Sequence, residues 1–259
     1  MSEPAAATGI IVRNCHGLAE FETCVGLQRR VWGGADIDVV PLPLFVVAAE
    51  TGGEVFGAFT GGEMVGFTLA LAAVRDGRPY LHSHMTAVLE EFRDRGVGRQ
   101  LKLFQRQDAL SRGIELVEWT FDPLEIKNAY FNLECLGAIA RRYLPNCYGL
   151  TTSPLHAGLP TDRLVAEWWL RSPGVETALA GGEEKGAKPA IAPPGAARIR
   201  VPATMDELRR GKPAEALRVQ GEIRRQFLDW TSRGYAAVGL ERRADGADYL
   251  LAPWEGNRS

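Results

Sequence analysis

The alternation of apolar and polar positions divides the first part of the chain into short elements. Residues 9 to 14 form an apolar run that predicts a strand, and from Gly17 to Trp32 apolar residues recur at helical spacing. Glutamates in the first turns of that stretch and arginines near its end suit the dipole of a helix. Residues 44 to 50 are too few for periodicity to separate helix from strand, and the order of elements favours a helix.

Glycine-bearing turns then separate three β-rich runs. Residues 55 to 59 and 64 to 69 flank Thr60-Gly61-Gly62-Glu63, an arrangement typical of a hairpin. A further break at residues 75 to 79 precedes a third run at residues 80 to 88. The sequence therefore predicts three antiparallel strands.

Later segments alternate between helical and extended patterns. We expect a helix over residues 98 to 111, a strand over 114 to 121, and a helix over 125 to 136 that ends at Gly137. Further strands are expected at residues 138–143, 164–170, 198–201, 236–240 and 249–251, with a helix at 213–233. The fold class is α/β (α+β), with a mixed, mostly antiparallel central sheet flanked by helices and a small C-terminal α/β extension.

Composition suggests where the domains end. Residues 180 to 197 repeat Gly, Ala, Pro and Lys with almost no large apolar side chain, so they cannot contribute much to a core. We expect a main domain at residues 1–172, a linker or long loop at 173–197, and a small subdomain at 198–259. The element order of that subdomain loosely repeats residues 9 to 70, without similarity at the level of residues.

Charge and cysteine content narrow the class of protein. A net charge of -2 gives no general attraction to nucleic acid. The start of the sequence does not resemble a secretion signal, and no apolar run has the length of a membrane span, so we expect a cytoplasmic protein without a membrane partner. The four cysteines are far apart, which favours buried thiols over a metal site.

The most informative segment joins the strand that ends at Val88 to the helix that begins near Gly98. Two glycines, Gly96 and Gly98, precede that helix, and their small size lets an anion approach the backbone N–H groups of its first turn. Arg93, Arg95 and Arg99 add positive charge nearby. A lone Gly-x-Gly is weak evidence, because it also occurs in plain tight connections.

This segment resembles the coenzyme A pyrophosphate loop of the GNAT superfamily of N-acyltransferases. The pattern Arg/Gln-x-x-Gly-x-Gly/Ala is met by Arg93, Gly96 and Gly98, while Val88 and Phe92 occupy the hydrophobic and aromatic places before it. The resemblance covers about residues 9 to 150, including the following helix at Asn128 to Gly137 and the strand after it, in the element order of that fold.

The resemblance implies a function. An acetyl or other short acyl group would pass from acyl-CoA to a small-molecule amine or amino acid by direct attack in a ternary complex, with no metal required. The thioester would lie where strands 80–88 and 114–121 splay apart, with backbone N–H groups stabilising the oxyanion. The implied cofactor-binding residues are Met85, Ala87, Val88, Arg93, Arg95, Gly96, Val97, Gly98, Arg99 and Asn128.

Attack requires a neutral amine, and an alkylammonium loses its proton only near pH 10.4, so a base is expected. Candidates are His82, His84, Glu90 and Glu118, of which His84 and Glu90 are our choices. His82 and His84 lie two residues apart on one strand and share a face. They could also bind a metal or serve as structural histidines.

The leaving thiolate needs a proton, which many members of the superfamily take from a tyrosine on the helix after the fifth strand. Here Leu133 stands at the usual position. Tyr130, one turn earlier, is our choice of catalytic acid, and Tyr143, Tyr148 or water are the alternatives.

Other readings stay open. Because the usual tyrosine is absent, the chain could be a non-catalytic acyl-CoA-binding or interaction protein. The many arginines are also compatible with a D-amino-acid-type N-succinyltransferase. An NAD(P)-binding oxidoreductase is a further alternative, because such enzymes have an acidic residue about twenty residues after a Gly-x-Gly-x-x-Gly motif, and Glu118 lies twenty residues after Gly98. However, Leu101 stands where that motif has its third glycine. Arg141 and Arg142 could hold a substrate carboxylate or form plain surface charge. A homodimer contact through the C-terminal segment is also open.

Overall fold

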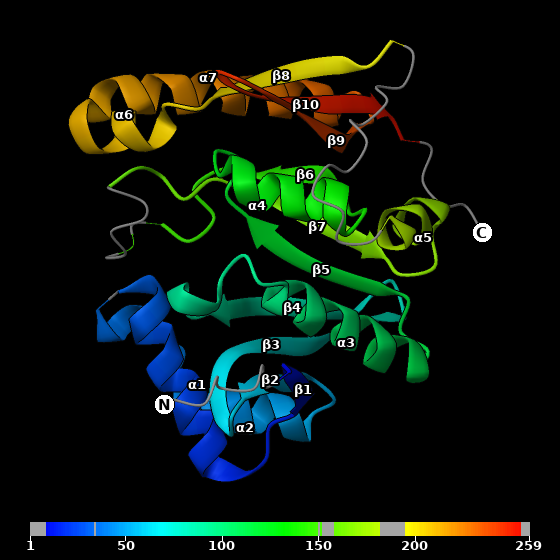
Figure 1. Ribbon diagram of the computed structural model, residues 1–259. Helices are drawn as coiled ribbons and strands as arrows, with labels where there is room; N and C mark the ends of the chain where they lie inside the picture. The colour runs from blue at the N-terminus through cyan, green and yellow to red at the C-terminus, as the bar shows by residue number, and fades with distance from the viewer. Residues whose placement is uncertain (1–8, 34, 150, 152–157, 182–194, 255–259) are drawn as a thin grey trace, which may run out of the picture. The chain divides into compact units, whose positions relative to one another are not determined.

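The computed structural model describes residues 9–33, 35–149, 151, 158–181 and 195–254, and its contacts divide the chain into two compact units. The first unit runs to Val117 and the second begins at Glu118. Figure 1 identifies the elements of both units, which are described separately below. This division by contacts differs from the domain boundaries expected near residues 172 and 198, which stay a prediction.

The first unit contains a four-stranded antiparallel sheet in the order β1-β2-β3-β4. Its strands are β1 (Ile11–Asn14), β2 (Glu54–Thr60), β3 (Glu63–Arg75) and β4 (Arg78–Val88). Two-residue turns join the last three strands, as the glycine-bearing breaks predicted. The expected antiparallel strands are confirmed, and β3 is longer than its apolar run because its last residues extend the hairpin into solvent.

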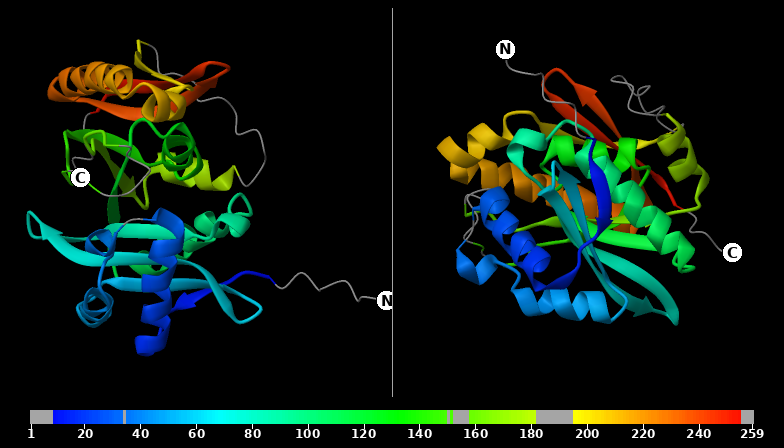
Figure 2. Two further views of the ribbon diagram at one scale, coloured as in Figure 1. Left: turned by 90° about the vertical axis from the view of Figure 1, so that its left-hand side faces the viewer. Right: turned by 60° about the horizontal axis from the view of Figure 1, so that its bottom comes forward.

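Helices cover both faces of this sheet (Figure 2). The apolar sides of α1 (Gly17–Trp32) and α2 (Leu42–Glu50) pack against one face, in a cluster that includes Phe45 and Phe67. On the other face, α3 (Val97–Ser111) packs through Val97 and Leu101. The helix expected at residues 44 to 50 is confirmed.

The second unit continues the antiparallel architecture with the strand order β5-β7-β6-β9-β10-β8. Its first strand, β5, starts within the last residues of the first unit. The strands are β5 (Leu116–Phe121), β6 (Ile139–Leu144), β7 (Arg163–Trp169), β8 (Ala197–Pro202), β9 (Tyr235–Arg243) and β10 (Gly246–Pro253). Mixed α/β structure with a largely antiparallel sheet flanked by helices is therefore the fold class, as expected.

The helix that ends at Gly137 has an unexpected geometry. Helix α4 (Ile126–Tyr130) continues as a π-helical turn over Phe131–Cys135, in which the Leu136 N–H donates to the Phe131 carbonyl. Turns of this kind are uncommon and often lie at functional sites. Its buried face includes Leu133, the residue at the position of the missing tyrosine.

The described residues of the second unit form three more helices: α5 (Pro173–Ala180), α6 (Met205–Gly211) and α7 (Pro213–Ser232). Helix α5 lies within the stretch expected to be a linker or long loop, and Ser172 accepts from Val175 N–H as its N-cap. Proline at the first helical position is compatible with a helix start, which explains the difference. Residues 182–194 of that stretch lie outside the described residues.

Helix α7 covers the C-terminal strands. Its Phe227 ring stacks on Tyr143 with centroids 5.3 Å apart and meets Tyr249 edge-on at 5.0 Å. The predicted hairpin of the last strands is confirmed. The proposed internal repeat is not supported by the strand pairing, because β1 pairs with β2 whereas β8 pairs with β10.

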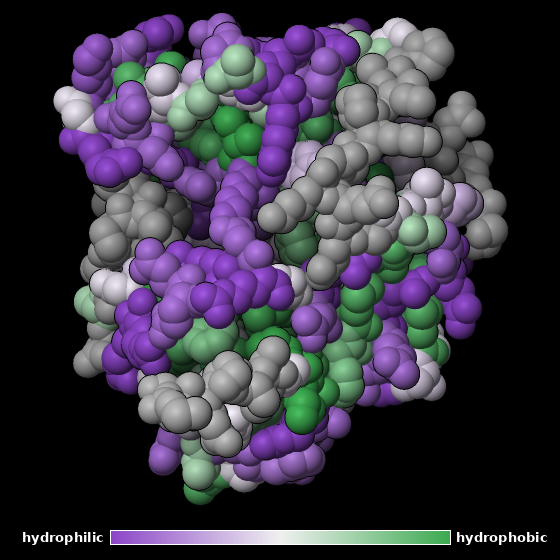
Figure 3. All heavy atoms as spheres, viewed as in Figure 1, coloured by the Kyte–Doolittle hydropathy of each residue, from purple (hydrophilic) through white to green (hydrophobic). Residues whose placement is uncertain are grey.

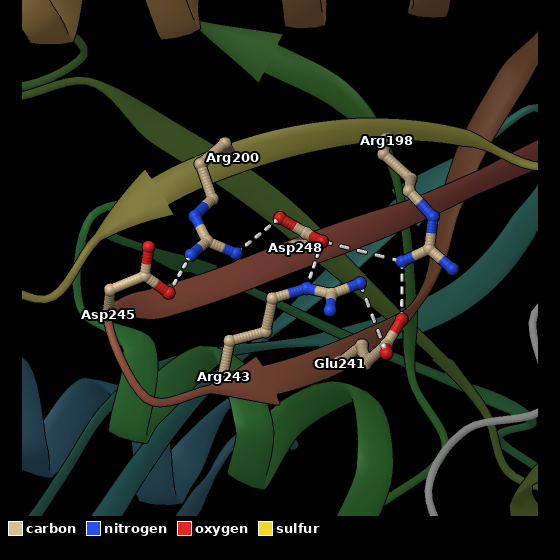
Figure 4. A network of polar contacts seen from close by, with 6 residues as sticks. All are labelled: Arg198, Arg200, Glu241, Arg243, Asp245 and Asp248. Carbon is tan, nitrogen blue, oxygen red and sulfur yellow. Dashed lines mark hydrogen bonds and ion pairs between the residues drawn. The ribbon is translucent and has the colours of Figure 1, made fainter.

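Asp248 on β10 is the centre of a charge network on one face of the C-terminal strands (Figure 4). Arg200 donates to its carboxylate at 2.9 Å and Arg243 at 2.6 Å. Burial alone would raise the pKa of Asp248, but these hydrogen bonds outweigh burial and lower the pKa. The network also contains Arg198, Glu241 and Asp245. It gives this sheet face a polar surface of paired charges.

Hydrophilic side chains occupy much of the surface in Figure 3, and hydrophobic ones gather in smaller patches. Across the described residues, no helix combines the length and the apolar character needed to cross a bilayer. All four cysteines are free thiols; two are buried and two are half-buried.

Candidate functional site

The connection between β4 and α3 positions the glycines and arginines singled out in the sequence. After Val88, the backbone forms a 3-10 turn at Glu90–Phe92, and Leu89 N–H still donates to Val65 of β3. Gly96 adopts a left-handed conformation with φ 76°, which glycine adopts without a Cβ penalty. The chain therefore turns sharply into the first residue of α3.

The first turn of α3 presents backbone N–H groups. Its N-cap is Gly96, which has no side chain to accept a hydrogen bond from this turn. Val97, 1% exposed, anchors the turn against β2 and β3. At Gly98, an added Cβ would meet nothing closer than Val88 Cγ2 at 4.0 Å. The helix start is thus fixed to the sheet while its donors and dipole favour an anion.

Three arginines surround this turn. Arg93 donates from Nε to the Val88 carbonyl at 3.2 Å, which ties the loop to the end of β4. The Arg95 guanidinium lies 5.6 Å from the Phe92 ring centroid, and Arg99 is half-buried on α3. The structure therefore brings together, within the first unit, the arginines and glycines of the predicted pyrophosphate loop.

Strand β4 contains a bulge at His84. The register pairs Leu69 with Met85 and Ala70 with Ser83, which leaves His84 as the extra residue. Bulges disrupt the ladder locally and re-aim side chains, and they are frequent beside active sites. His82 and His84 rings are 6.2 Å apart, as expected for residues on one face.

Burial lowers the pKa of His84, so its imidazole stays neutral at neutral pH. A neutral imidazole can accept a proton, as a general base must. Glu90, the other chosen base, is exposed at the start of the 3-10 turn. Ala87 is a core residue, 1% exposed, so only its backbone can face a ligand, while Met85 is partly buried.

The remaining predicted site residues, Asn128 and Tyr130, belong to the second unit. Asn128 is exposed on α4, and the Tyr130 ring lies 3.7 Å from the Arg242 guanidinium. Burial raises the pKa of Tyr130, and the nearby Arg242 charge opposes that shift. A neutral Tyr130 would be a proton donor at neutral pH.

The two alternative tyrosines are already engaged. Tyr143 donates to Asp162 at 2.6 Å, and burial followed by this hydrogen bond raises its pKa. Tyr148 shares a 2.6 Å hydrogen bond with Thr120. Tyr143 is therefore a structural donor to a buried carboxylate, and Tyr148 is hydrogen-bonded to Thr120.

Sequence analysis did not predict a series of buried, hydrogen-bonded polar side chains that links α3 to β4. Lys102 of α3, 4% exposed, donates to Ser83 Oγ at 2.9 Å and to Gln105 at 3.0 Å. Gln105 donates to Glu54 at 2.6 Å, and Arg112 pairs with the same carboxylate at 2.7 Å. Helical spacing places Lys102, Gln105 and Ala109 on one side of α3, and this was the only signal available.

Comparisons with known proteins agree with this geometry. Residues 30–131 match the acetyltransferase (GNAT) family. No curated protein matches the chain. The matched segment includes α2, the four-stranded sheet except β1, the loop at Gly96 and Gly98, and α4.

Solved structures share the fold at low sequence identity. The ribosomal-protein-S18-alanine N-acetyltransferase from Escherichia coli is 14% identical with a TM-score of 0.50, covering 61% of this chain and 92% of its own. A putative GNAT acetyltransferase from Desulfovibrio desulfuricans has 14% identity and a TM-score of 0.51, covering 62% and 99%.

An aminoglycoside 6'-acetyltransferase type Ii is 18% identical with a TM-score of 0.50, covering 62% of this chain and 98% of its own. The family match covers the part of the chain that contains the loop at Gly96 and Gly98. Residues 30–131 of this chain are therefore similar to the GNAT family of acetyltransferases, and the solved structures show that the chain shares the fold of such enzymes.

Proposed function

We propose that this enzyme transfers an acetyl or other short acyl group from acyl-CoA to the amine of a small molecule or amino acid, in the cytoplasm. The observation that carries the proposal is the start of α3, where Gly96 leaves the first helical turn without a side-chain cap. Backbone donors, the helix dipole and nearby arginines together favour the pyrophosphate of a nucleotide cofactor.

Acyl-CoA would be held mainly by the first unit. Its pyrophosphate would accept from the N–H groups of Val97, Gly98 and Arg99, while Arg93 and Arg95 offset its charge. Pantetheine would follow the backbone of β4 between Met85 and Val88. Asn128 of the second unit is proposed as a further contact to the cofactor.

Direct attack of the amine on the thioester requires a base and benefits from an acid. We assign the base to His84, whose lowered pKa keeps it able to accept a proton at neutral pH. Glu90 is the second candidate, acting through water because it is exposed. Tyr130 is assigned as the donor to the departing thiolate.

The bulge at His84 supports this assignment, because it interrupts the regular hydrogen bonding of β4 near the proposed oxyanion donors. Preorganised backbone donors stabilise the charge that develops on a thioester oxygen. No covalent acyl-enzyme is needed, so acyl-CoA and the amine must be bound together.

Steady-state turnover tests the proposal. Purified protein is incubated with acetyl-CoA and a panel of amines, amino acids and peptides, and free thiol release and N-acetyl product are measured. Product that forms in equal amounts with free thiol supports transfer, and intersecting initial-rate patterns support a ternary complex. Ping-pong patterns would contradict direct attack.

The non-catalytic reading makes a different prediction. Its basis is Leu133, buried at the place where many relatives have a tyrosine. Tight acetyl-CoA binding without turnover on the whole panel would favour a binding protein. Turnover that falls in Tyr130→Phe but persists in Tyr148→Phe would instead establish Tyr130 as the substitute acid.

A further inference from the structure

Three neighbouring strands of the first unit contribute one row of side chains beneath α3. The register pairs Glu54 of β2 with Ala70 of β3, and the same Ala70 with Ser83 of β4. All three residues are buried. A small apolar side chain thus lies between two polar ones, and buried polar groups of this kind require hydrogen-bond partners.

Two side chains of α3 connect the polar ends of this row. Lys102 donates from Nζ to Ser83 Oγ at 2.9 Å and to Gln105 Oε1 at 3.0 Å. Gln105 donates from Nε2 to Glu54 Oε2 at 2.6 Å, and Arg112 donates to the other oxygen of that carboxylate at 2.7 Å. The small central side chain leaves room for this bridge. The hydrogen bonds therefore tie β4 to β2 across β3.

The bridge reaches β4 at the point where this strand loses its regular register. Ser83 is the last residue before the bulge, His84 is the extra residue, and Met85 resumes the pairing. Ser83 faces α3, so its neighbour His82 faces the opposite side of the sheet. The His84 ring lies 6.2 Å from the His82 ring. Because the bulge leaves His84 unpaired in the ladder, the direction of its side chain depends on how firmly Ser83 is held.

A polar bridge fixes the strand more precisely than apolar packing does. Hydrogen bonds are directional, and a buried network whose members are satisfied makes its surroundings rigid. Ser83 is 3% exposed, Lys102 4% and Gln105 0%, so water does not compete for these hydrogen bonds. The position of Ser83 is therefore set by α3 as well as by the neighbouring strand.

We propose that Lys102 is a positioning residue, which through Ser83 holds the β4 bulge so that the His84 imidazole is aimed at the acceptor amine. This inference rests on the proposed acyl transfer, in which His84 is the base, and adds the residues that fix its direction. Lys102 acts only through Ser83 and His84. A catalytic group works only when its supporting residues hold it close to the productive geometry, and a misplacement of about 1 Å can lower turnover by about 100-fold.

Turnover of acetyl-CoA with an amine that the wild type acetylates tests the proposal in the full chain. Ser83→Ala removes one hydroxyl group and leaves Lys102 its hydrogen bond to Gln105. It is made in the wild type and in the His84→Gln background. The matched control is Ala109→Gly, which weakens the buried side of α3 by its low helix propensity without changing these hydrogen bonds. Thermal unfolding confirms that each variant is folded.

We expect Ser83→Ala to lower kcat about tenfold in the wild type, with an unchanged KM for acetyl-CoA, and to have no further effect when His84 is already replaced. Lys102→Met lowers kcat as Ser83→Ala does, and the two changes together lower it no further, because both remove the same hydrogen bond. Ala109→Gly keeps the wild-type kcat. A loss of the same size in both backgrounds, or in Ala109→Gly, would show a general structural effect and overturn the proposal.

NMR of the histidine rings separates this inference from the proposed function, because it needs no substrate. The His84 signal is identified by its loss in His84→Gln. Burial lowers the pKa of His84 in the wild type, so a ring released by Ser83→Ala should titrate closer to the ordinary value of about 6.5, while Ala109→Gly leaves its pKa unchanged. An unchanged His84 pKa in Ser83→Ala would overturn the positioning role even in an active enzyme. A raised pKa in a protein that acetylates no amine would support that role while the proposed function fails.

Discussion

Lys102 lies in an environment that is unusual for its residue type. A lysine ammonium is strongly hydrated in water, yet this one is 4% exposed and its hydrogen-bond acceptors at Ser83 and Gln105 are neutral. Burial lowers its pKa to about 7, and the Glu54 carboxylate opposes part of that shift. Lys102 also contacts Ser83, the residue before the bulge, so it supports the strand that we assign to the thioester.

The stability of the protein should therefore depend on Lys102 between pH 7 and pH 10. In that window the folded chain releases the Lys102 proton, while an unfolded lysine keeps it up to about pH 10.4. The unfolded state binds more protons, so the free energy of unfolding rises with pH, by at most about 1.4 kcal/mol per pH unit from one group.

Urea unfolding at several pH values measures this effect by comparing wild type with Lys102→Met. The difference between the two free energies should move in favour of wild type as the pH rises from 7 to 10. Burial raises the pKa of Glu54 to about 7, so its titration mainly affects the range below pH 7. A difference that is constant above pH 7 would contradict a lowered pKa for Lys102.

The catalytic assignment of His84 predicts a pH dependence of turnover. Because burial lowers its pKa, kcat/KM should fall only below the ordinary histidine range near pH 6.5. His84→Gln should lower kcat by about 100-fold or more, as for loss of a general base, and remove that acid limb. His82→Gln is the matched control on the same face of β4. Equal losses in both variants with an unchanged pH profile would indicate a structural role instead.

At the residue scale, sequence reasoning found the chemistry that has a local signature. Gly96, Gly98 and the arginines follow one another in the chain, so their spacing was readable. The series of hydrogen bonds from Ser83 through Lys102 to Glu54 joins residues up to 51 positions apart in the sequence, so it has no local sequence pattern. Only packing brings those side chains together.

At the scale of elements, the close approach of β3 to the end of β4 fixes the position of the strand that we assign to the cofactor. Gly66 of β3 faces the end of β4, and an added Cβ would lie 2.7 Å from the Ala87 carbonyl oxygen. Such a contact is too short for carbon and oxygen, so β4 would have to shift. The geometry of the proposed cofactor strand thus depends on a glycine one strand away.

Gly66→Ala should destabilise the protein by about 1 to 3 kcal/mol through overpacking and weaken acetyl-CoA binding. The control is Gly26→Ala within α1, where an added Cβ meets nothing within 4 Å and helix propensity favours alanine by about 1 kcal/mol. Chemical unfolding and calorimetry measure both effects. A Gly66→Ala protein as stable as wild type would show that β4 is free to shift.

Elements with clear periodicity or glycine turns were predicted well, including α1, the β2–β3 hairpin and α7. Two kinds of feature were not predicted from the sequence: short helices and β-bulges. Short helices such as α5 and α6 have too few residues for a periodic signal. Bulges at His84 and Arg141 depend on the partner strand, so a single strand cannot predict them.

For the molecule as a whole, the central question is whether residues 198–259 are a separable extension. In the second unit, Arg224 of α7 forms two 2.8 Å hydrogen bonds with Asp162, whose side chain is fully buried. Arg209 of α6, also buried, pairs with Asp122 at 2.7 Å. These contacts indicate that the C-terminal helices complete the second unit.

A chain that ends at Gly181 should therefore fail to form β6 and β7 stably. It loses Arg224 and Phe227, which leaves the Asp162 carboxylate buried without its arginine and uncovers Tyr143, at a cost of several kcal/mol. Hydrogen exchange of β6 and β7 amides measures the effect, with a chain that ends at Trp254 as the control. Protection equal to that of the full chain would mean that residues 198–259 are an independent extension.

The start of α3 gives the most direct test of the central claim, that acyl-CoA binds through its first helical turn. Gly98 is the second residue of α3, where an aspartate interacts favourably with the helix dipole and its Cβ meets no close neighbour. Gly98→Asp thus leaves the fold intact and places a negative charge where the pyrophosphate is proposed to bind. Gly221→Asp, in the open interior of α7, adds the same charge elsewhere.

Calorimetric titration of acetyl-CoA into these three proteins decides the matter. We predict that wild type and Gly221→Asp bind with equal affinity, and that Gly98→Asp binds at least tenfold more weakly without a lower unfolding temperature. Equal binding by Gly98→Asp and wild type, or no binding by wild type, would contradict the assignment of this turn to the cofactor.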